Sequence, residues 1–263
     1  MPRRSLGAWT IATLVFLYAP IAVLVLFSFN TSRLNIVWEG FTTRWYGAMW
    51  SDVVLMKAAA NSLLVASVTT LLSVALGTAG GWLLHRYRFP GARLWRALIL
   101  TPMLVPEVVM GVSLLALFVF LRLELGFTSL ILAHVTFCFP FVLMLVQSRL
   151  ARLDPALEEA AMDLGATPAI AFRRVLLPQL RPAVVSGALL AFALSLDELI
   201  VSYFTASAAS RTLPLEIFGR VRRGLDPSLN AISTCFLLAS MMLVLGSEVL
   251  RRRSEPVAQG EKR

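Results

Sequence analysis

Residues 158–182 read EEAAMDLGATPAIAFRRVLLPQLRP, a charged segment between two long apolar stretches. Just before it, Asp154 is a good N-cap and Pro155 is favoured at the first helical position. We therefore expect a helix from Pro155 to about Leu164. Gly165 supplies the left-handed residue that commonly ends a helix, so the segment begins with a short, capped helix.

The second half of the segment repeats the same start signal at Thr167 and Pro168. We expect a second helix that ends before Pro178, because the residue preceding a proline is pushed away from helical geometry. Arg181 and Pro182 would then open the next apolar stretch. The segment is thus predicted to be two short helices joined by a turn.

The first of these helices offers two kinds of surface. Its small apolar face consists of Leu157, Ala160, Ala161 and Leu164. Its carboxylates are Glu158, Glu159 and Asp163. A solvated connector is one interpretation, but a loop of about 30 residues is longer than a connection between helices requires. The pattern favours the docking of a partner protein.

The apolar stretches on either side are typical of an integral membrane protein. Apolar residues make up 58% of the 263 positions and the mean hydropathy is +0.77, against roughly 45–50% apolar residues in soluble domains. About 20 apolar residues in a helix cross a hydrocarbon core of about 30 Å. We predict an all-α membrane protein, one transmembrane domain over residues 1–263 with six spans at 8–29, 58–84, 97–120, 127–147, 183–204 and 229–250.

Three local features modify this plan. The first span follows Arg3 and Arg4 without a small-residue cleavage pattern, so we expect it to remain as a helix with a basic anchor. Pro102 and Pro106 each remove a backbone hydrogen bond from the third span and should kink it. The aromatic stretch FTTRWYGAMW at 41–50 is typical of a segment lying at the membrane interface.

The distribution of basic residues predicts which side of the membrane each loop faces. Two thirds of the 24 lysines and arginines lie in the N-terminal tail, 85–96, 148–182 and 251–263; the others lie in 30–57, 121–126 and 205–228. Positive charge accumulates on the cytoplasmic side, so both termini and the loop 148–182 are predicted to be cytoplasmic. The same distribution accounts for the net charge of +9 without nucleic acid.

Among the acidic residues within the predicted spans, three are candidates for a functional role: Glu107, Asp197 and Glu198. A charge there costs of the order of 2.5–3.5 kcal/mol on insertion scales, so it demands an explanation. Without matching basic residues in the spans, these acids indicate a path for cations. The alternative is that they hydrogen-bond to polar neighbours or lie in water near the outer boundary. The candidate neighbours are Ser113, Ser195, Ser202 and His134.

The sequence lacks the motifs that nucleotide binding, metal binding or nucleophilic catalysis would require. No phosphate-binding Gly-x-x-x-x-Gly-Lys-Ser/Thr loop occurs, and the GTAGG stretch at 77–81 favours close helix packing. His85 and His134 lack metal-ligand spacing, and no nucleophile elbow is present. Cys138 and Cys235 lie in apolar runs, where thiols behave as small hydrophobes. We therefore predict no catalytic residue, metal site or cofactor in this chain.

The quoted segment resembles the EAA loop of binding-protein-dependent ABC importer permeases. Glu-Ala-Ala, three residues, glycine, nine residues and Val-Leu-Leu-Pro follow at the family spacing, with Val175 in the usual isoleucine place. In that family the loop is a coupling helix seated on the ATP-hydrolysing subunit. The resemblance implies ATPase-coupling roles for Glu159, Ala160, Ala161, Asp163, Gly165, Leu177 and Pro178. ATP and Mg would be bound by the partner.

Longer stretches resemble the spermidine/putrescine permeases of the type I importers, particularly the second of their two membrane subunits. They are HRYRFPG, LTPMLVPEVVMGVSLL, LGFTSLILAHVTFCFPFV, SGALLAFALSLDELIVSYF and TLPLEIFGRVRRGLDPSLNAIST. At the position of Glu198 that family more often has Asp. Related permeases for opines and aminophosphonates share much of the pattern. The resemblance therefore implies one fold but leaves several substrates open.

The resemblance also implies partners and an outer gate. The partners are a second permease subunit, two ATPase subunits and an extracytoplasmic substrate-binding protein, assembled in a bacterial inner membrane. The stretch 211–224 is similar to an outer loop whose short helix starts at Pro214 and helps to form the gate, which includes Ile217 and Phe218. Its arginines at 220, 222 and 223 would meet acids of the binding protein or form a solvated face. A rival function is a proton-coupled transporter with Glu107 and Asp197 as relay.

Overall fold

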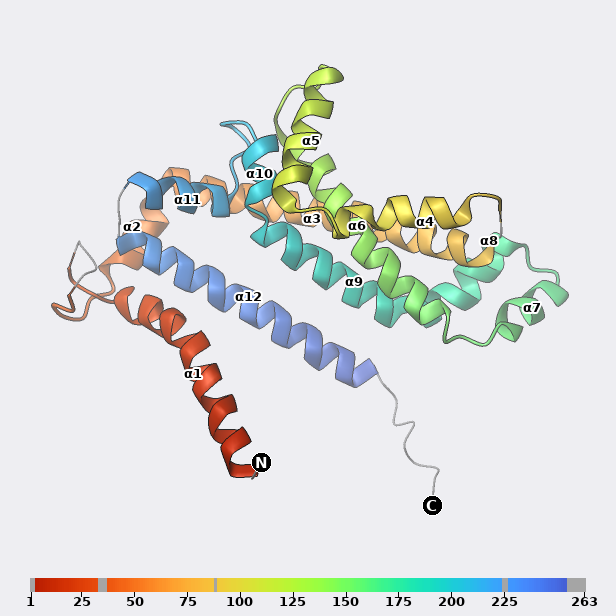
Figure 1. Cartoon of the computed structure of the whole chain (residues 1–263), viewed down its shortest axis with the longest axis horizontal. Helices are drawn as coiled ribbons and strands as arrows, with labels where there is room; N and C mark the ends of the chain where they lie inside the picture. Colours follow the sequence, from red (N-terminus) through yellow and green to blue (C-terminus); the bar gives the residue numbers. More distant parts are fainter. Residues whose placement is uncertain (1–2, 33–36, 88, 224–226, 255–263) are drawn as a thin grey trace. The chain divides into compact units, whose positions relative to one another are not determined.

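The computed structural model describes residues 3–32, 37–87, 89–223 and 227–254, and the side chains of residues 3–6, 8, 223, 227 and 243–254 are not described. Within these ranges every regular element is a helix, which confirms the all-α class (Figure 1). The chain divides into two compact units, one of residues 1–58 and 215–242 and the other of residues 59–214 and 243–263.

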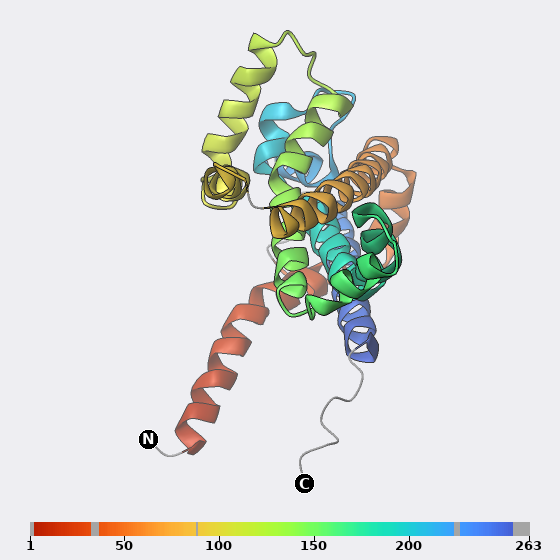
Figure 2. The ribbon, with the colours of Figure 1, turned by 90° about the vertical axis from the view of Figure 1, so that its right-hand side faces the viewer.

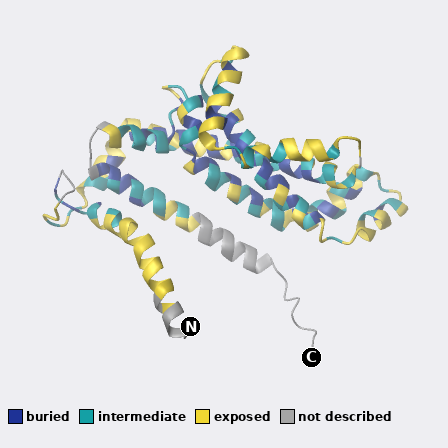
Figure 3. Cartoon of the chain, viewed as in Figure 1, coloured by how far each residue is buried: buried dark blue, intermediate teal, exposed yellow. Residues whose placement is uncertain are grey.

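The first unit begins with α1 (Arg3–Phe27), an apolar helix whose described side chains are mostly exposed (Figure 3). The chain then turns around the buried side chain of Asn30, which donates to Val37 O at 2.7 Å and accepts from Glu39 N at 2.9 Å. The aromatic stretch forms α2 (Arg44–Ser51), and Trp45 Nε1 donates to Asn30 O at 2.7 Å. A polar side chain thus organises this turn.

The second unit is built on three long helices: α3 (Val53–Arg86), of which it contains the part from residue 59 on, α6 (Phe127–Leu150) and α9 (Leu177–Asp197). Glycines allow their close approach. A Cβ atom on Gly77 of α3 would lie 2.7 Å from Cβ of Val142 in α6, and one on Gly187 of α9 would lie 3.0 Å from its Cγ1. This contact confirms that the GTAGG stretch serves helix packing.

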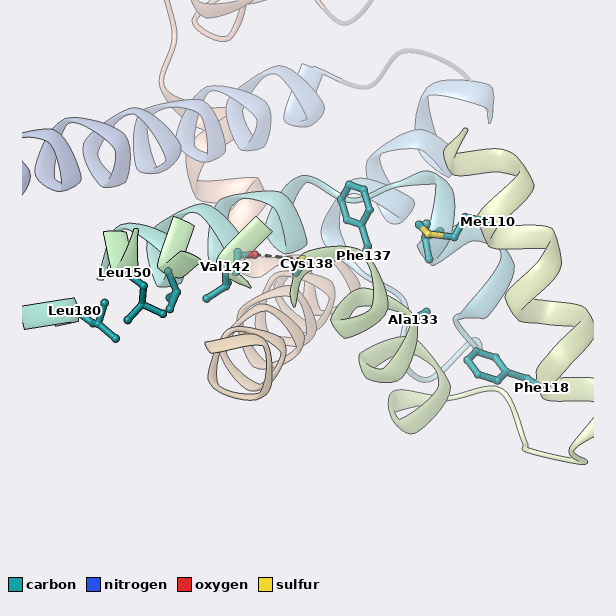
Figure 4. Packing of buried hydrophobic residues seen from close by; sticks show 11 residues of the cluster. Met110, Phe118, Ala133, Phe137, Cys138, Val142, Leu150 and Leu180 are labelled. Atoms are coloured by element: carbon teal, nitrogen blue, oxygen red, sulfur yellow. Dashed lines mark hydrogen bonds between the residues drawn. The ribbon is translucent and has the colours of Figure 1, made fainter. Parts of the chain in front are cut away.

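A hydrophobic cluster follows α6 through this unit (Figure 4). Cys138 and Val142 are fully buried near its middle, and Leu180 of α9 closes one end. At the other end, Met110 and Phe118 come from α5 (Glu107–Phe120). Because α6 contributes to the cluster along most of its length, it is the central helix of the unit.

The predicted third span is broken, not kinked. It consists of α4 (Ala92–Leu100), a 3-10 turn η1 (Thr101–Met103) and α5, and the two α-helices are bent by 109° (Figure 2). Pro102 is the second residue of the 3-10 turn, whereas Pro106 has extended geometry with ψ 134° and is the N-cap residue of α5. Two missing amide donors four residues apart leave too few hydrogen bonds to carry one helix through.

The second predicted loop helix does not end before Pro178, which corrects that expectation. Helix α8 (Pro168–Ala171) continues through a π-helical turn η2 (Phe172–Leu176) directly into α9. Pro178 lies in the first turn of α9. The wider π turn relieves the clash that a proline ring makes with the preceding turn, so the helix passes the proline unbroken.

The predicted fifth span, 183–204, is likewise not one helix. Helix α9 ends at Asp197, Glu198 is extended with ψ 109°, and α10 (Ile200–Thr205) follows. The apolar pattern extends across this break, so composition did not reveal it. Hydrogen bonds from Val201 N to the carboxylate of Glu198 and from Ser202 Oγ to its carbonyl hold the chain at this break.

The remaining helices are α7 (Ala156–Asp163), α11 (Leu213–Arg223) and α12 (Pro227–Ser254). Among the described residues, four helices are long and apolar enough to cross a membrane, and counting the bent pair α4 and α5 as one span makes five. The four are 9–27, 53–86, 127–150 and 168–197. The sixth predicted span falls on α12, and the basic tail from residue 255 lies outside the described residues.

Candidate functional site

An acidic cavity of about 390 Å³ lies where α5, α6, α9 and α10 meet. Its lining residues are Glu107, Phe137, Ala193, Leu194, Asp197, Glu198, Leu199 and Ile200. All three acids predicted from the sequence are among them, although Glu107 is some 90 residues from the other two in the chain. No lysine or arginine is among these described lining residues, so their negative charge is uncompensated there.

The ends of helices place these acids. Glu107 is the first residue of α5 and is exposed, at a helix N-terminus where a negative charge is favoured. Asp197 is the last residue of α9 and is also exposed. Their carboxylates are therefore available to a solute in the cavity.

Glu198 has a different environment from its neighbour. Its side chain is buried, and its Oε1 accepts a hydrogen bond from the backbone N–H of Val201 at 2.8 Å. It therefore caps the N-terminus of α10 in the way that shorter acids usually do. Of the two adjacent acids, Asp197 faces the cavity freely and Glu198 also supports the local fold.

The polar neighbours considered for these acids bond mainly to one another. His134 of α6 is fully buried, with Nδ1 at 2.8 Å from Ser195 Oγ and Nε2 at 2.9 Å from Ser202 Oγ. Ser202 Oγ donates in turn to Glu198 O at 2.8 Å, a backbone and not a carboxylate oxygen. From the sequence, His134 was considered as a hydrogen-bond partner for an acid. That it connects Ser195 of α9 with Ser202 of α10 could not be predicted, because this contact depends on how the helices pack.

The loop after α6 has the predicted helix and turn, displaced by one residue at its start. Asp154 Oδ1 accepts from Ala156 N at 3.0 Å, and α7 begins after Pro155. Gly165 has a φ of +84°, which confirms the left-handed residue that follows α7. Thr167 caps α8 by accepting from Ile170 N at 3.4 Å.

Of the three acids of α7, one forms an ion pair within the chain and two are exposed. Glu158 forms an ion pair with Arg86 at the end of α3, and Arg86 Nη2 also lies 3.4 Å from the sulfur of Met162. Glu159 and Asp163 are exposed. Of the two predicted alanines, Ala160 is exposed and Ala161 buried, and both Leu157 and Leu164 are exposed.

A stacked aromatic pair also joins α3 to this loop. The rings of Trp82 and Phe172 lie 4.4 Å apart between centroids, with 28° between their planes. Phe172 opens the π-helical turn that leads to Leu177 and Pro178 at the start of α9. Trp82, Arg86 and Phe172 were not singled out from the sequence, because nothing local distinguishes them from other aromatic and basic residues near helix ends.

The predicted outer-gate helix corresponds to α11, in which Pro214, Ile217 and Phe218 are half-buried. The guanidinium of Arg222 lies 4.5 Å from the centre of the Phe218 ring. The side chain of Arg223 lies outside the described residues. The structure therefore gives the short helix, with one of its basic side chains laid over an aromatic ring.

Arg220 does not point to a partner protein, which corrects that expectation. Its Nη1 and Nη2 donate to Asp52 at 2.5 and 3.1 Å, and its Nε donates to Glu216 at 2.8 Å. The hydrogen bond from Arg220 is the main cause that holds the pKa of Asp52 below its ordinary value, and the same bond raises the pKa of Arg220. This triad stabilises α11 against the start of α3 within the first unit.

No cluster of three or more metal-binding side chains is found among the described residues. Cys138 is buried and Cys235 half-buried, and both are free thiols. The only chemistry concentrated in the described cavity is therefore that of the three carboxylates.

Comparison with known proteins identifies the chain's relatives. Residues 73–257 match the family described as binding-protein-dependent transport system inner membrane component. The chain is 39% identical to the spermidine/putrescine transport system permease protein PotC of Escherichia coli (strain K12), over 95% of both chains. It is 43% identical to the putrescine transport system permease protein PotI of the same strain, over 87% of this chain and 85% of that one.

A solved structure shares the fold. The crystal structure of a bacterial alginate ABC transporter, in complex with alginate pentasaccharide-bound periplasmic protein, superposes with a TM-score of 0.72 at 15% identity, over 95% of this chain and 93% of that chain. The family match takes in the cavity acids, the α7 loop and the break at Glu198. The chain therefore belongs to the family of binding-protein-dependent transport system inner membrane components.

Proposed function

We propose that this chain is the permease subunit of an ATP-driven importer that carries polyamines such as spermidine and putrescine across a bacterial inner membrane. The observation that carries the proposal is the acidic cavity. Polyamines are polycations at neutral pH, and three carboxylates line the cavity without a basic residue among its lining. Two relatives that align with most of the chain are permeases of spermidine/putrescine and putrescine transport systems.

The electrostatics of the cavity support a cationic cargo. Coulomb attraction between a carboxylate and an ammonium group is several times larger in a protein site than in water. Asp197 and Glu107 are exposed at the ends of two different helices, so a flexible diamine can meet both in turn. An opine or aminophosphonate carries anionic groups that the same acids repel, which makes these the less favoured cargoes.

The ends of the second unit support the proposed sidedness. At one end, Arg86 contacts Glu158 and Trp82 stacks on Phe172. At the other, Asn61 Nδ2 donates to Ala209 O at 3.1 Å, and Ser129 Oγ donates to Thr205 O at 2.9 Å. The first end carries the basic loops 85–96 and 148–182, so we assign it to the cytoplasm.

The partners follow from this assignment. The exposed surface of α7, with Glu159, Asp163, Ala160 and Leu164, has the mixed acidic and apolar character that suits docking on a cytoplasmic ATPase subunit. ATP and Mg would be bound there and not in this chain, which is a transport subunit and not an enzyme. A second permease subunit and an extracytoplasmic substrate-binding protein would complete the importer, with α11 at the outer gate.

Six spans complete the topology. They are α1, α3, the broken pair α4 and α5, α6, the helix from α8 through α9, and α12. The part of α12 whose side chains are described, Ser228–Met242, is apolar but shorter than a full crossing. With six spans both termini are cytoplasmic, in agreement with the basic residues near each end.

An uptake assay with the complete transporter tests this function. Cells that express the four kinds of subunit should accumulate radiolabelled putrescine or spermidine, and unlabelled polyamine should compete whereas an opine or an aminophosphonate should not. Vanadate should block uptake and a protonophore added to ATP-loaded proteoliposomes should not. Uptake driven by a proton gradient in the chain alone would instead establish the proton-coupled transporter.

A further inference from the structure

The hydrogen bonds around His134 form a chain in which each group donates to the next, from Ser195 through His134 and Ser202 to the carbonyl of Glu198. Ser202 Oγ donates its single hydrogen to Glu198 O at 2.8 Å, so towards the ring its oxygen offers only lone pairs. The bond between Ser202 and Nε2 must therefore be donated by the ring. In the neutral imidazole the hydrogen is then on Nε2, and Nδ1 accepts from the hydroxyl of Ser195.

This chain of bonds crosses the break between two helices. Ser195 lies in the last turn of α9, Ser202 lies in α10, and His134 on α6 connects them. The last acceptor is the backbone carbonyl of Glu198, the extended residue at which the span breaks. An extended residue between helices lacks the usual helical hydrogen bonds, so its position depends on bonds of this kind.

The same residue is held from its other side as well. The carboxylate of Glu198 accepts from Val201 N at 2.8 Å, so both its backbone carbonyl and its side chain are fixed. Asp197 precedes it directly and ends α9 at the cavity wall. His134 does not line the cavity; Phe137, about one turn further along α6, does.

We propose that His134 is a positioning residue for transport, which fixes the break at Glu198 and thereby the direction in which Asp197 and Glu198 meet a cation in the cavity. This inference rests on the proposed function, because the aim of the two carboxylates matters to transport only if a cation passes them. The ring acts through the acids and does not contact the solute.

A double-mutant cycle in the complete transporter tests the inference, with radiolabelled putrescine uptake as the readout. His134→Leu removes both bonds at similar volume and should lower uptake about tenfold, the effect of one buried group left unpaired. His134→Gln keeps a donor and an acceptor and should retain more uptake. Thr136→Val is the matched control on α6, because its hydroxyl donates only to Leu132 O within the same helix.

The decisive variant combines His134→Leu with Asp197→Asn. If the ring acts by aiming the acids, the loss of uptake in the double variant should be clearly smaller than the product of the two single losses, because one of the two charges to be aimed is already gone. Effects that multiply would overturn the positioning role and leave the acidic path intact. Wild-type uptake by Asp197→Asn would overturn both the path and this inference.

A folding defect is distinguished by the amount of assembled complex in the membrane. Should His134→Leu fail to assemble, Ser195→Ala removes one bond of the chain and enters the same cycle, with the same expectation of a combined loss smaller than the product of the two single losses. Wild-type uptake by either well-assembled variant, His134→Leu or Ser195→Ala, would contradict the inference.

Discussion

Arg86 at the end of α3 forms an ion pair with Glu158 of α7, which joins two segments 72 residues apart in the chain. Both side chains are mostly buried, with 19% and 17% of their surface exposed. The pair therefore attaches the loop proposed to contact the ATPase to one of the long membrane helices.

The ion pair predicts a loss of coupling when either charge is removed. Arg86→Gln leaves the Glu158 carboxylate partly buried without its partner, which should cost roughly 1–3 kcal/mol at this contact. Uptake should fall while the chain still reaches the membrane. The exchange Arg86→Glu with Glu158→Arg should recover part of the uptake, and Arg93→Gln, at an exposed residue of α4, should have little effect. Full activity of Arg86→Gln would contradict a coupling role for the pair.

Gly165 predicts a strict conformational requirement after α7. Its φ is +84°, and open space surrounds the position of a Cβ atom, so a side chain meets backbone strain and not a clash. Gly165→Val should cost at least roughly 1–2 kcal/mol and strongly reduce uptake, whereas Gly165→Asn should be tolerated because asparagine enters this region readily. Gly47→Val is the control, with equal space but no left-handed φ. Membrane level and uptake are measured together; equal uptake by the Val and Asn variants would remove the backbone explanation.

Asp197 predicts a charge requirement in the cavity. Asp197→Asn keeps size and hydrogen-bonding capacity, so assembly should be normal, but uptake should fall severalfold or more because an attraction of about 1 kcal/mol or above is lost. Asp197→Glu should retain more activity than Asn. Polyamine binding to the separate binding protein, measured by calorimetry, should be unchanged. Glu124→Gln, an exposed acid outside the cavity lining, serves as control.

Asp52 predicts a pH-dependent contribution to the stability of the first unit. Its pKa is held low, chiefly by the hydrogen bond from Arg220. A carboxyl with a lower pKa in the folded state stabilises that state above its unfolded pKa, and this contribution is lost as pH falls through the folded value. Asp52→Asn, which keeps the acceptor for Leu55 N, should therefore lower the Tm of the purified transporter at pH 7.

The difference in Tm between wild type and Asp52→Asn should narrow as the pH is lowered below about 4, where the carboxyl begins to protonate in the unfolded chain, and it should disappear once the pH is below the lower pKa of the folded state. Glu39→Gln removes an exposed acid of the same unit and should change the Tm little at any pH. A constant difference between wild type and Asp52→Asn over the whole range would show that the charge of Asp52 is not what matters.

Two introduced cysteines test on which side of the membrane the loops lie. On a background with Cys138 and Cys235 replaced by alanine, Ala169→Cys should react with a membrane-impermeant thiol reagent only in inverted vesicles. Ala208→Cys should react only from outside. Both positions are exposed, so access depends on the membrane and not on burial in the chain. The reverse labelling pattern would invert the topology and remove the proposed ATPase contact.

Several local features could be read from the sequence because their causes are local. Gly165 follows a capped helix, and its left-handed φ depends only on the turn that it forms. The apolar stretches gave helices close to the predicted bounds, for example α6 at 127–150 against 127–147. The same reasoning failed at Pro178. A proline ends a helix only when the preceding turn has ordinary α geometry, and here a π turn before Pro178 lets the helix continue.

The broken spans show the limit of such reasoning. Pro102 and Pro106 indicate where backbone hydrogen bonds are missing, but a bend of 109° depends on what the freed helix packs against. No proline lies at the second break, between α9 and α10. There Glu198 is extended because its own carboxylate and the hydroxyl of Ser202 replace helical hydrogen bonds.

From the sequence alone we could predict that the chain is helical and apolar, that Glu107, Asp197 and Glu198 interrupt its apolar stretches, and that a charged loop with a glycine turn follows the fourth stretch. The packing of the helices was needed to show that Glu107 lies at one cavity with Asp197, and that Arg86, among all the basic residues near helix ends, pairs with Glu158. The physical reason is range: helix propensity and capping act over a few residues, whereas these contacts join segments 72 or more residues apart and form only when the long helices pack.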